Sequence, residues 1–539
     1  MIKVLEKHPV ISICILVALM LLPNLDVMQV TIMEARNFIT AREMLTDQHW
    51  LLTSMNGEAR YEKPPLPTWL SAISASIFGI NSLFALRLPT VFMIMIVGVF
   101  TYRLSFLLLK NNLHSLINAF LVVTSFYTIG ITVEAPWDIY THGFMLIAIY
   151  HMFQLFDKKN KYWKHTLIAG ICLGLSFLSK GPVSLYALFL PFLLAYAFTY
   201  KFKKMRPKTF SLFSVLILMC CIGGWWFIYV RLQDPATFAL ITEKETSNWG
   251  SYNIRPFYYY WSFFTQSGIW TIPAFISLLF PYLKNKVRNL KAYKFSFYWT
   301  IFAVILLSII PEKKSRYLMP VLIPLAINTG FYIDYLIQRF KTLQNKKETL
   351  PVYFNFGLLG AIGVLFPVIA YLGLKDKLNG QWVAFALASA VLFTIGSFIF
   401  IYLKRKTIKE VFFLSVLLFA AILMFGLPLY KATIPEKYYE ITTLKKEAEK
   451  EDLKIYSYNY VSPEMLWLYG DKILNISNEN KIDFPDEKSF GLLTNDLNEE
   501  EMQSLNAHYK VEFQKSFDLN TGKKPNKRLK NNYYILTKK

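Results

Sequence analysis

The chain has 539 residues, of which 54% are hydrophobic and 17% charged. A soluble chain of this length would divide into several domains and would carry more charge. The net charge of +22 does not indicate a nucleic-acid partner, because the basic residues lie mostly in short loops between apolar runs, where they set membrane topology. The cysteines all lie inside apolar runs, so no disulfide framework is indicated.

Apolar runs recur along the chain, and each is long enough to cross a hydrocarbon core about 30 Å thick. They predict a polytopic α-helical membrane protein with about thirteen spans. The stretch 67–80 predicts a shorter helix on the membrane surface before the second span. The predicted spans are 8–28, 83–109, 113–131, 136–156, 166–181, 183–200, 209–231, 262–282, 294–310, 316–337, 352–373, 381–403 and 409–428.

The charges of the loops indicate how these spans are oriented. With the N-terminus in the cytoplasm, the even-numbered spans from the fourth onward end in basic loops, as the positive-inside rule requires. An odd number of spans then places the tail on the outer face, which is the periplasm for a bacterial cytoplasmic (inner) membrane. We predict two domains: a transmembrane domain at 1–428, with a first outer loop at 29–82 that carries surface helices, and an extracytoplasmic domain at 429–539.

The tail has the pattern of a small α/β domain. Short apolar alternations predict strands, and amphipathic stretches between them predict helices. The tail shows no glycine-rich phosphate loop and no cluster of metal ligands, so we expect a supporting role for it. The predicted strands are 454–461, 489–494, 510–516 and 532–537, and the predicted helices are 440–452, 462–470 and 497–508.

The first outer loop opens with a predicted amphipathic helix at 32–45, because apolar residues recur there at helical spacing. Glu34 and Arg36 lie near its start. A carboxylate suits proton transfer and a cation suits phosphate binding, so both residues are candidates for a site. The alternative for Glu34 is that its charge stabilises the N-terminus of the helix.

Lys63 stands in a stiff segment, since the two prolines at 64–65 cannot continue a helix and force the residues before them to be extended. A cation held in place in this way suits phosphate binding. The alternative is a connector whose lysine reaches toward lipid headgroups. The neighbouring residues Arg60, Tyr61 and Glu62 are candidate substrate-binding residues.

Carboxylates also occur at the start of the fourth span. Glu134 and Asp138 are four residues apart and share one face of a helix that begins near Pro136. A carboxylate at the mouth of an apolar span is costly to bury and usually functional. We therefore predict Asp138 as a general base and Glu134 as a substrate-binding residue, with a helix cap as the alternative for Glu134. His142 is a candidate partner of Asp138, but too few other ligands converge there for a metal site.

Several cations lie on the predicted outer face, against the topological preference, and binding an anion is one reason for such a placement. For Lys313 and Arg316, in the short loop 311–317, we favour binding of a donor phosphate. For Arg42, Lys375 and Lys377 we favour a solvated loop position. The other outer cations are Arg36, Arg60, Lys63, Lys180, Arg231, Lys244, Arg255 and Lys314.

The outer loop 231–261 combines Glu243, Glu245 and Arg255 with an aromatic run near its end. The aromatic residues indicate an interfacial belt, a platform on which a sugar stacks, or both. With only 7 histidines in the chain, the sequence supports neither a metal site nor a cofactor.

Three segments together resemble a known family. EARNFITAREML (34–45), NGEARYEKPPLPTWL (56–70) and FALRLPTVF (84–92) are similar to the N-terminal signature of the GT-C membrane glycosyltransferases. Within that group the chain most resembles the lipid A aminoarabinose transferases, with the protein O-mannosyltransferases as broader kin. SKGP at 179–182 and RYLMPVLIPLA at 316–326 fit the same pattern.

The resemblance implies an inverting glycosyltransferase. It implies that a sugar, aminoarabinose or another pentose or hexose, moves from a polyprenyl (undecaprenyl) phosphate carrier to lipid A or a similar acceptor at the outer face of the cytoplasmic membrane. The family's carboxylates and donor-phosphate ligands carry over to this chain, together with a loop aromatic. The matching positions are Glu34, Arg36, Glu62, Lys63, Asp138 and Tyr317.

The chain departs from the family at Met33-Glu34, where its relatives usually have Asp-Glu, so either Glu34 or Asp138 must serve as the catalytic carboxylate. The 231–261 loop has no histidine, which puts in doubt any metal that relatives hold there. Two other functions stay open. One is a protein O-mannosyl or O-glycosyltransferase with a glycoprotein acceptor, and the other, from a different class, is a membrane transporter or lipid flippase. No internal repeat supports the transporter.

Overall fold

The chain divides into two units, which we describe separately. The computed structural model describes residues 2–134, 136–158, 162–203, 205–478, 481–522 and 524–539. The helical unit consists of Met1–Val27, Tyr61–Pro67 and Arg87–Leu429, and the mixed unit of Met28–Arg60, Thr68–Leu86 and Tyr430–Lys539. We had predicted that the first outer loop would belong with the transmembrane part. Most of this loop instead joins the tail, because its helices share an apolar core with the tail.

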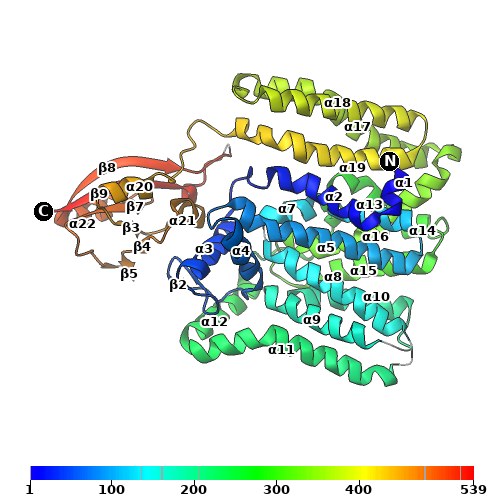
Figure 1. Cartoon of the computed structure of the whole chain (residues 1–539), viewed down its shortest axis with the longest axis horizontal. Coiled ribbons are helices and arrows are strands. Elements are labelled where there is room, and N and C mark those ends of the chain that lie inside the picture. Colours follow the sequence, from blue (N-terminus) through cyan, green and yellow to red (C-terminus); the bar gives the residue numbers. More distant parts are fainter. Residues whose placement is uncertain (1, 135, 159–161, 204, 479–480, 523) are drawn as a thin grey trace. The chain divides into compact units, whose positions relative to one another are not determined.

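The helical unit is built from helices, most of them apolar, that lie side by side (Figure 1). They are α1 (Ile2–Lys7), α2 (Pro9–Leu21), α5 (Leu83–Leu109), α6 (Asn112–Val123), α7 (Phe126–Glu134), α8 (Pro136–Asp157), α9 (Trp163–Lys180), α10 (Leu190–Thr199), α11 (Thr209–Gln233), α12 (Pro235–Ser251), α13 (Thr271–Ser277), α14 (Phe280–Leu283), α15 (Leu290–Ile309), α16 (Met319–Arg339), α17 (Lys346–Leu374), α18 (Trp382–Lys404) and α19 (Ile408–Ala421).

Length and composition confirm a multi-pass helical membrane protein. In the described chain, seven helical segments are long and apolar enough to cross a membrane, and α6 with α7, bent by 45°, makes an eighth if the pair counts as one span. The predicted span 83–109 coincides with α5. The count of thirteen stays a prediction, because the helices at the other predicted spans are shorter, broken or less apolar. The seven segments are Leu83–Leu109, Arg206–Gln233, Leu290–Ile309, Ser315–Thr342, Lys346–Lys377, Trp382–Lys404 and Ile408–Thr433.

The predicted span 262–282 is not one continuous helix. It forms a 3₁₀ segment (Phe263–Trp270), then α13 and α14. Gly268 has a φ of 66°, which a helix does not allow and which favours glycine. The indole of Trp270, 1% exposed, donates a hydrogen bond of 2.8 Å to Oγ1 of Thr124. The segment therefore packs as broken turns inside the helical unit.

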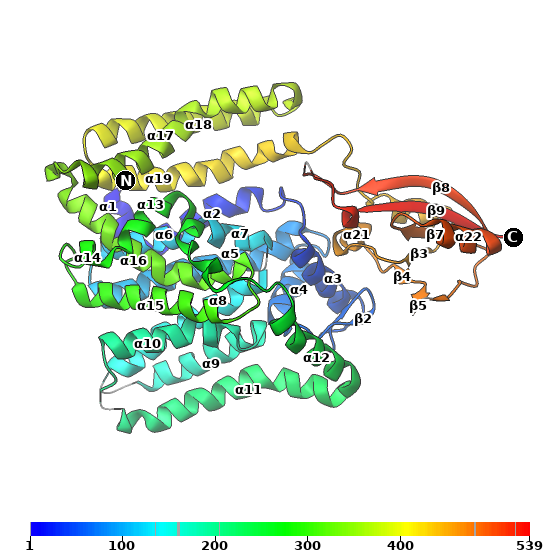
Figure 2. The ribbon, with the colours of Figure 1, turned by 180° about the vertical axis from the view of Figure 1, so that it is seen from behind.

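Small residues let neighbouring helices approach closely. At Gly174 in α9, an added Cβ would lie 2.6 Å from Cβ of Ile222 in α11. At Gly223 in α11, it would lie 2.9 Å from the carbonyl oxygen of Gly174. Such contacts leave no room for a larger side chain, as expected where helices associate in a membrane through van der Waals packing. In both views α11 lies beside α9, and α17 forms a hairpin with α18 (Figure 2).

The mixed unit contains a five-stranded sheet in the order β4-β3-β7-β9-β8. β3 runs parallel to β4 and β7, whereas β9 is antiparallel to β7 and β8. The predicted strands and helices of the tail all occur, within a few residues. The elements are α3 (Ile32–Thr46), β1 (Ser54–Met55), β2 (Glu58–Ala59), α4 (Leu66–Phe78), α20 (Leu444–Lys450), β3 (Ile455–Tyr458), α21 (Pro463–Tyr469), β4 (Leu474–Asn475), β5 (Ser477–Asn478), β6 (Lys481–Ile482), β7 (Ser489–Thr494), α22 (Glu499–His508), β8 (Tyr509–Asp518) and β9 (Lys530–Lys538).

The helix predicted at 32–45 is present as α3, and most of its side chains are buried in the mixed unit. Its Phe38 packs edge-on against Trp467 of α21, with ring centres 5.5 Å apart. Arg42 is 6% exposed, and its guanidinium donates to the carbonyls of Leu466, Trp467 and Asp471. The prediction of a solvated loop position for Arg42 is therefore wrong, because this side chain ties α3 to the end of α21.

Candidate active site

Asp138 and Lys180 form a buried ion pair in the helical unit. Asp138 lies in the first turn of α8 and Lys180 in the last turn of α9, and their side chains are 2% and 10% exposed. Nζ of Lys180 donates to Oδ1 of Asp138. Two further hydrogen bonds align the helices: Thr141 donates to the carbonyl of Ser176 over 2.7 Å, and Ser176 to that of Thr141 over 2.6 Å. Because each lies about one turn from the pair, helix packing sets the place of both charges.

Lys63, Arg316 and Tyr317 lie around this pair. Nζ of Lys180 is 5.2 Å from the centre of the Tyr317 ring, and the charges of Arg316 and Lys63 both act on Lys180. Nε of Arg316 is buried without a hydrogen-bond partner in the described chain. We call Lys63, Asp138, Lys180, Arg316 and Tyr317 the charged cluster. It sets three cations against one carboxylate, an arrangement that suits an anionic ligand.

The loop that carries Arg316 and Tyr317 is held by its own charges. The hydroxyl of Tyr317 donates to Oε1 of Glu312 over 3.2 Å, and Glu312 pairs with Lys314 at 2.5 Å. Nζ of Lys313 donates to the carbonyls of Ile310 over 2.6 Å and of Arg255 over 3.1 Å. Burial lowers the pKa of Lys313, which is 3% exposed. The structure thus gives Lys313 two backbone partners, whereas the sequence predicted a phosphate ligand.

Tyr61 and Lys63 each reach an acidic side chain near α12. The Tyr61 hydroxyl donates to Oδ2 of Asp234 over 3.1 Å, and Nζ of Lys63 lies 3.0 Å from Oε2 of Glu245. Burial and the bond to Asp234 raise the pKa of Tyr61 to about 12. The hydrogen bonds that Asp234 accepts from Thr237 and Tyr61 lower the pKa of this carboxyl. Tyr61 is therefore a neutral hydrogen-bond donor at physiological pH.

Three predicted site residues belong to the mixed unit. Glu34 is fully buried and forms a capping box with Thr31: its Oε2 accepts from the Thr31 N–H over 3.2 Å, and its own N–H donates to Thr31 Oγ1 over 3.4 Å. The structure thus shows the helix-end role that we weighed against catalysis. Arg60 donates 2.9 Å hydrogen bonds to the carbonyl of Arg36 and to Oγ1 of Thr40. These contacts position the loop after α3.

Glu62 and Glu134 are the two predicted substrate-binding residues that follow Tyr61 and precede Asp138 in the chain. Glu62 is exposed in the helical unit. Glu134 ends α7, but its side chain lies outside the part of the chain that the structure describes. His142 is 1% exposed, one turn after Asp138, and its Nδ1 has no hydrogen-bond partner among the described residues. The predicted substrate-binding roles of Glu62 and Glu134 stay predictions.

One group of side chains has the composition of a metal site. In the mixed unit, ligand atoms of Glu43, Asp47 and His49 all lie within 4.8 Å of one another. Glu43 already accepts hydrogen bonds from the Asn56 N–H over 2.6 Å and the Ser54 hydroxyl over 2.5 Å. Asp47 pairs with a lysine of the tail, Lys472, at 2.7 Å. These partners account for the group without an ion.

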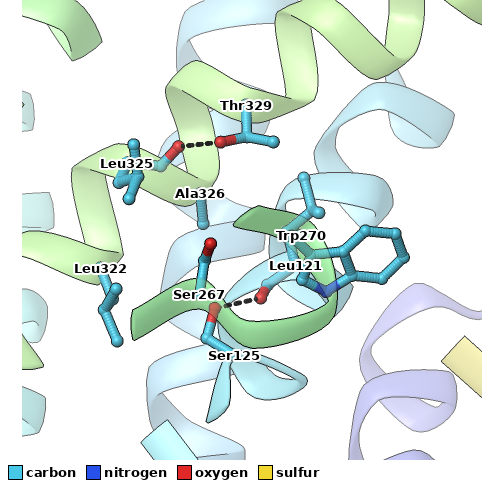
Figure 3. A pocket seen from close by; sticks show the side chains of 8 residues that line it. All are labelled: Leu121, Ser125, Ser267, Trp270, Leu322, Leu325, Ala326 and Thr329. Atoms are coloured by element: carbon cyan, nitrogen blue, oxygen red, sulfur yellow. Dashed lines mark hydrogen bonds between the residues drawn. The ribbon is translucent and has the colours of Figure 1, made fainter. Parts of the chain in front are cut away.

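The helical unit also has a small pocket, which Figure 3 shows between the 3₁₀ segment, α6 and α16. Two of its hydroxyl groups bond to the carbonyl four residues earlier: Ser125 donates to the carbonyl of Leu121, and Thr329 to that of Leu325 (Figure 3). None of the lining residues is ionisable, so the pocket is a packing feature separate from the charged cluster. The lining residues are Leu121, Ser125, Ser267, Trp270, Leu322, Leu325, Ala326 and Thr329.

Sequence reasoning did not assign three residues that the structure brings to the site. Lys180 had appeared only as one outer cation among many, although a lysine at the end of an apolar span is costly to bury without a partner. Asp234 and Glu245 lie in the loop 231–261, and their partners Tyr61 and Lys63 are 173 and 182 residues earlier. No local pattern predicts such pairs.

Comparison with known proteins finds one family and several relatives. The family model for dolichyl-phosphate-mannose-protein mannosyltransferases matches residues 62–226, a segment that contains Lys63, Asp138 and Lys180. An uncharacterized protein of Aquifex aeolicus is 27% identical over 385 residues, which cover 68% of this chain and 73% of that protein. The undecaprenyl phosphate-alpha-4-amino-4-deoxy-L-arabinose arabinosyl transferase of Photorhabdus laumondii is 23% identical over 316 residues, which cover 54% of this chain and 53% of that protein. The chain thus aligns with about half the length of that transferase.

A solved structure matches almost the whole chain. The crystal structure of ArnT from Cupriavidus metallidurans bound to undecaprenyl phosphate has a TM-score of 0.70 and 13% sequence identity. The match covers 98% of this chain and 97% of that one. At this identity the likeness shows a shared fold.

Proposed function

We propose that this chain, a member of the GT-C superfamily of membrane glycosyltransferases related to the lipid A aminoarabinose transferases, transfers a sugar from an undecaprenyl phosphate carrier. The acceptor is lipid A or a similar molecule at the outer face of the cytoplasmic membrane. The names of the relatives support the donor and sugar class. The charged cluster is the observation that carries the proposal, because it offers cations for a phosphate beside one carboxylate.

The three cations of the charged cluster suit the phosphate that acts as the leaving group. During transfer the bond between the anomeric carbon and the phosphate oxygen breaks, and that oxygen keeps the electron pair. Negative charge therefore develops on the phosphate, and Lys63, Lys180 and Arg316 stabilise it there. The buried Nε of Arg316, which lacks a protein partner in the described chain, adds a donor for this anion.

The carboxylate of the charged cluster, Asp138, is suited to activate or orient the acceptor. A new bond forms between the anomeric carbon and an acceptor oxygen, with inversion at that carbon. A hydroxyl acceptor loses its proton as it attacks, and Asp138 accepts this proton as general base. A phosphate acceptor is already anionic, and Asp138 then orients it. Glu34 is our second candidate for this role, beside its place in the capping box of α3.

We place the protein in a bacterial inner membrane, with the N-terminus in the cytoplasm and the C-terminal part of the chain in the periplasm. The basic loops after the even-numbered spans support this orientation. The donor-phosphate cations then lie on the outer face, where a lipid-linked sugar and a lipid acceptor meet.

Transfer to protein is the second candidate, and the matching family model supports it because that family comprises protein mannosyltransferases. One experiment separates the two. Mass spectrometry of lipid A and of surface glycoproteins is compared between a strain that lacks this protein and its parent. Loss of a sugar from lipid A supports the first proposal, and loss from a glycoprotein supports the second. If both profiles are unchanged, the proposed acceptors are wrong.

A further inference from the structure

The surface helix α12 is held against the charged cluster by acidic side chains. None of its residues whose side chains the structure describes is buried, so apolar packing contributes little to its position. Asp234, which caps α12, accepts a hydrogen bond from Tyr61, and Glu245 pairs with Lys63. Both contacts reach the segment 61–63, which precedes two buried prolines. In the ion pair between them, Lys63 is thus the partner whose position is fixed, and Glu245 is the partner that another anion can displace.

The ion pair between Lys63 and Glu245 remains open to ligands. Their side chains are 27% and 40% exposed, and the two atoms lie 3.0 Å apart. The pair Lys180–Asp138, in contrast, is almost fully buried. An exposed pair is worth little free energy, so another anion can take the place of the carboxylate. In the structure, the carboxylate of Glu245 is paired with Lys63, the cation to which the proposed function assigns the donor phosphate.

We propose that Glu245 and the phosphate of the carrier lipid bind Lys63 in turn, and that the return of Glu245 expels the product. This inference rests on the proposed function. The donor is a phosphodiester with one negative charge, whereas the product is a phosphate monoester with a charge of about −1.5 to −2 at pH 7. Three cations therefore hold the product more tightly than the donor. The carboxylate of Glu245, which α12 holds beside Lys63, competes with the product for this cation and so offsets the tighter binding of the product.

The test compares Glu245→Gln with the matched control Glu243→Gln. Glu243 is an exposed carboxylate on the same helix, with no ion pair in the part of the chain that the structure describes. Glutamine keeps the size of the side chain at each position and removes only the charge. Binding of undecaprenyl phosphate is measured with the purified full-length protein in nanodiscs at fixed ionic strength. Glu245→Gln should bind about two- to fivefold more tightly, the range of an exposed ion pair, and Glu243→Gln should match the unmodified protein.

A kinetic measurement tests the release step itself. If product release limits turnover, the ratio of the steady-state rate to the single-turnover rate should fall about two- to fivefold in Glu245→Gln. A purely structural role for Glu245 would leave this ratio unchanged. Added undecaprenyl phosphate should also inhibit Glu245→Gln at lower concentration than it inhibits the unmodified protein.

The variant Lys63→Ala distinguishes failure of this inference from failure of the proposed function. If Lys63→Ala binds undecaprenyl phosphate weakly while Glu245→Gln binds it as the unmodified protein does, the competition is wrong and the proposed function stands. If Glu245→Gln binds it more weakly, Glu245 supports the site and the inference is also wrong. If the unmodified protein does not bind undecaprenyl phosphate, the proposed function fails and this inference fails with it.

Discussion

Lys180 and Asp138, which are 42 residues apart in the sequence, meet as a buried ion pair where the last turn of α9 lies beside the first turn of α8. The hydrogen bonds between Thr141 and Ser176 fix the two helices one turn away. Removing one partner from a buried pair leaves an uncompensated charge and costs roughly 3–5 kcal/mol. Folding therefore depends on the same charges that we assign to the transfer reaction.

Asp138→Asn should lower the rate of sugar transfer by about 10²–10⁴-fold, the contribution typical of a general base. Asparagine keeps an oxygen that can accept the hydrogen bond from Lys180, so the fold should tolerate it better than Asp138→Leu. Transfer is measured with undecaprenyl-phosphate-linked sugar and purified acceptor, and thermal unfolding in detergent serves as the folding control. A folded Asp138→Asn protein that transfers sugar within about twofold of the original rate would exclude Asp138 as the base.

Local patterns predicted much of the fold. The apolar run at 83–109 coincides with α5, and the alternation at 489–494 coincides with β7, because period and length alone identify such elements. The prediction of one continuous span at 262–282 failed, because hydropathy averaged over a window does not detect a single glycine with positive φ, here Gly268. The prediction for Arg42 failed because its carbonyl partners lie more than 420 residues later in the chain.

The candidate site was predicted in part. Asp138 was predicted from the cost of burying a carboxylate at the mouth of an apolar span, Lys63 from the stiff segment before two prolines, and Arg316 from its place on the predicted outer face. Their pairing was not predictable from one sequence, because contacts such as Lys63 with Glu245 join segments that are far apart along the chain. Glu34 shows the opposite case: the helix-end alternative rested on local sequence alone, and the capping box is what the structure shows.

Lys63 and Lys313 should respond differently to loss of charge. Lys63→Ala should weaken binding of the lipid-linked donor about tenfold or more, because a hydrogen bond to a charged group is worth roughly 1.5–3 kcal/mol. Lys313→Met should instead lower the free energy of unfolding by about 1–3 kcal/mol, since the carbonyls of Ile310 and Arg255 lose their donor. Donor titration and thermal unfolding of both variants check this. Equal loss of donor affinity would restore Lys313 as a phosphate ligand.

Glu34 can be tested without loss of its structural role. A capping box accepts glutamine in place of glutamate, so Glu34→Gln should unfold at nearly the same temperature as the unmodified protein. Glu34→Ala loses the bond to the Thr31 N–H and should be less stable by about 1 kcal/mol. Transfer activity of the glutamine variant then decides the catalytic question. A large loss of transfer in a fully folded Glu34→Gln protein supports catalysis, and normal transfer leaves Glu34 a purely structural residue.

Tyr61 should make stability depend on alkaline pH. Its pKa rises from an ordinary value of about 10 to about 12 through burial and the hydrogen bond to Asp234, so the folded state favours the neutral hydroxyl. This contribution is complete below pH 10, where the unfolded chain is also protonated, and is lost as the pH rises through 12. Between pH 9 and pH 11 the unmodified protein should lose about 1 kcal/mol that Tyr61→Phe does not lose. Unfolding at both pH values measures the difference.

The ultraviolet titration of the unmodified protein minus that of Tyr61→Phe should show one tyrosine near pH 12, which moves toward pH 10 in Asp234→Asn. A tyrosine that titrates near pH 10 in the unmodified protein would show that the Tyr61–Asp234 bond does not hold α12 in solution.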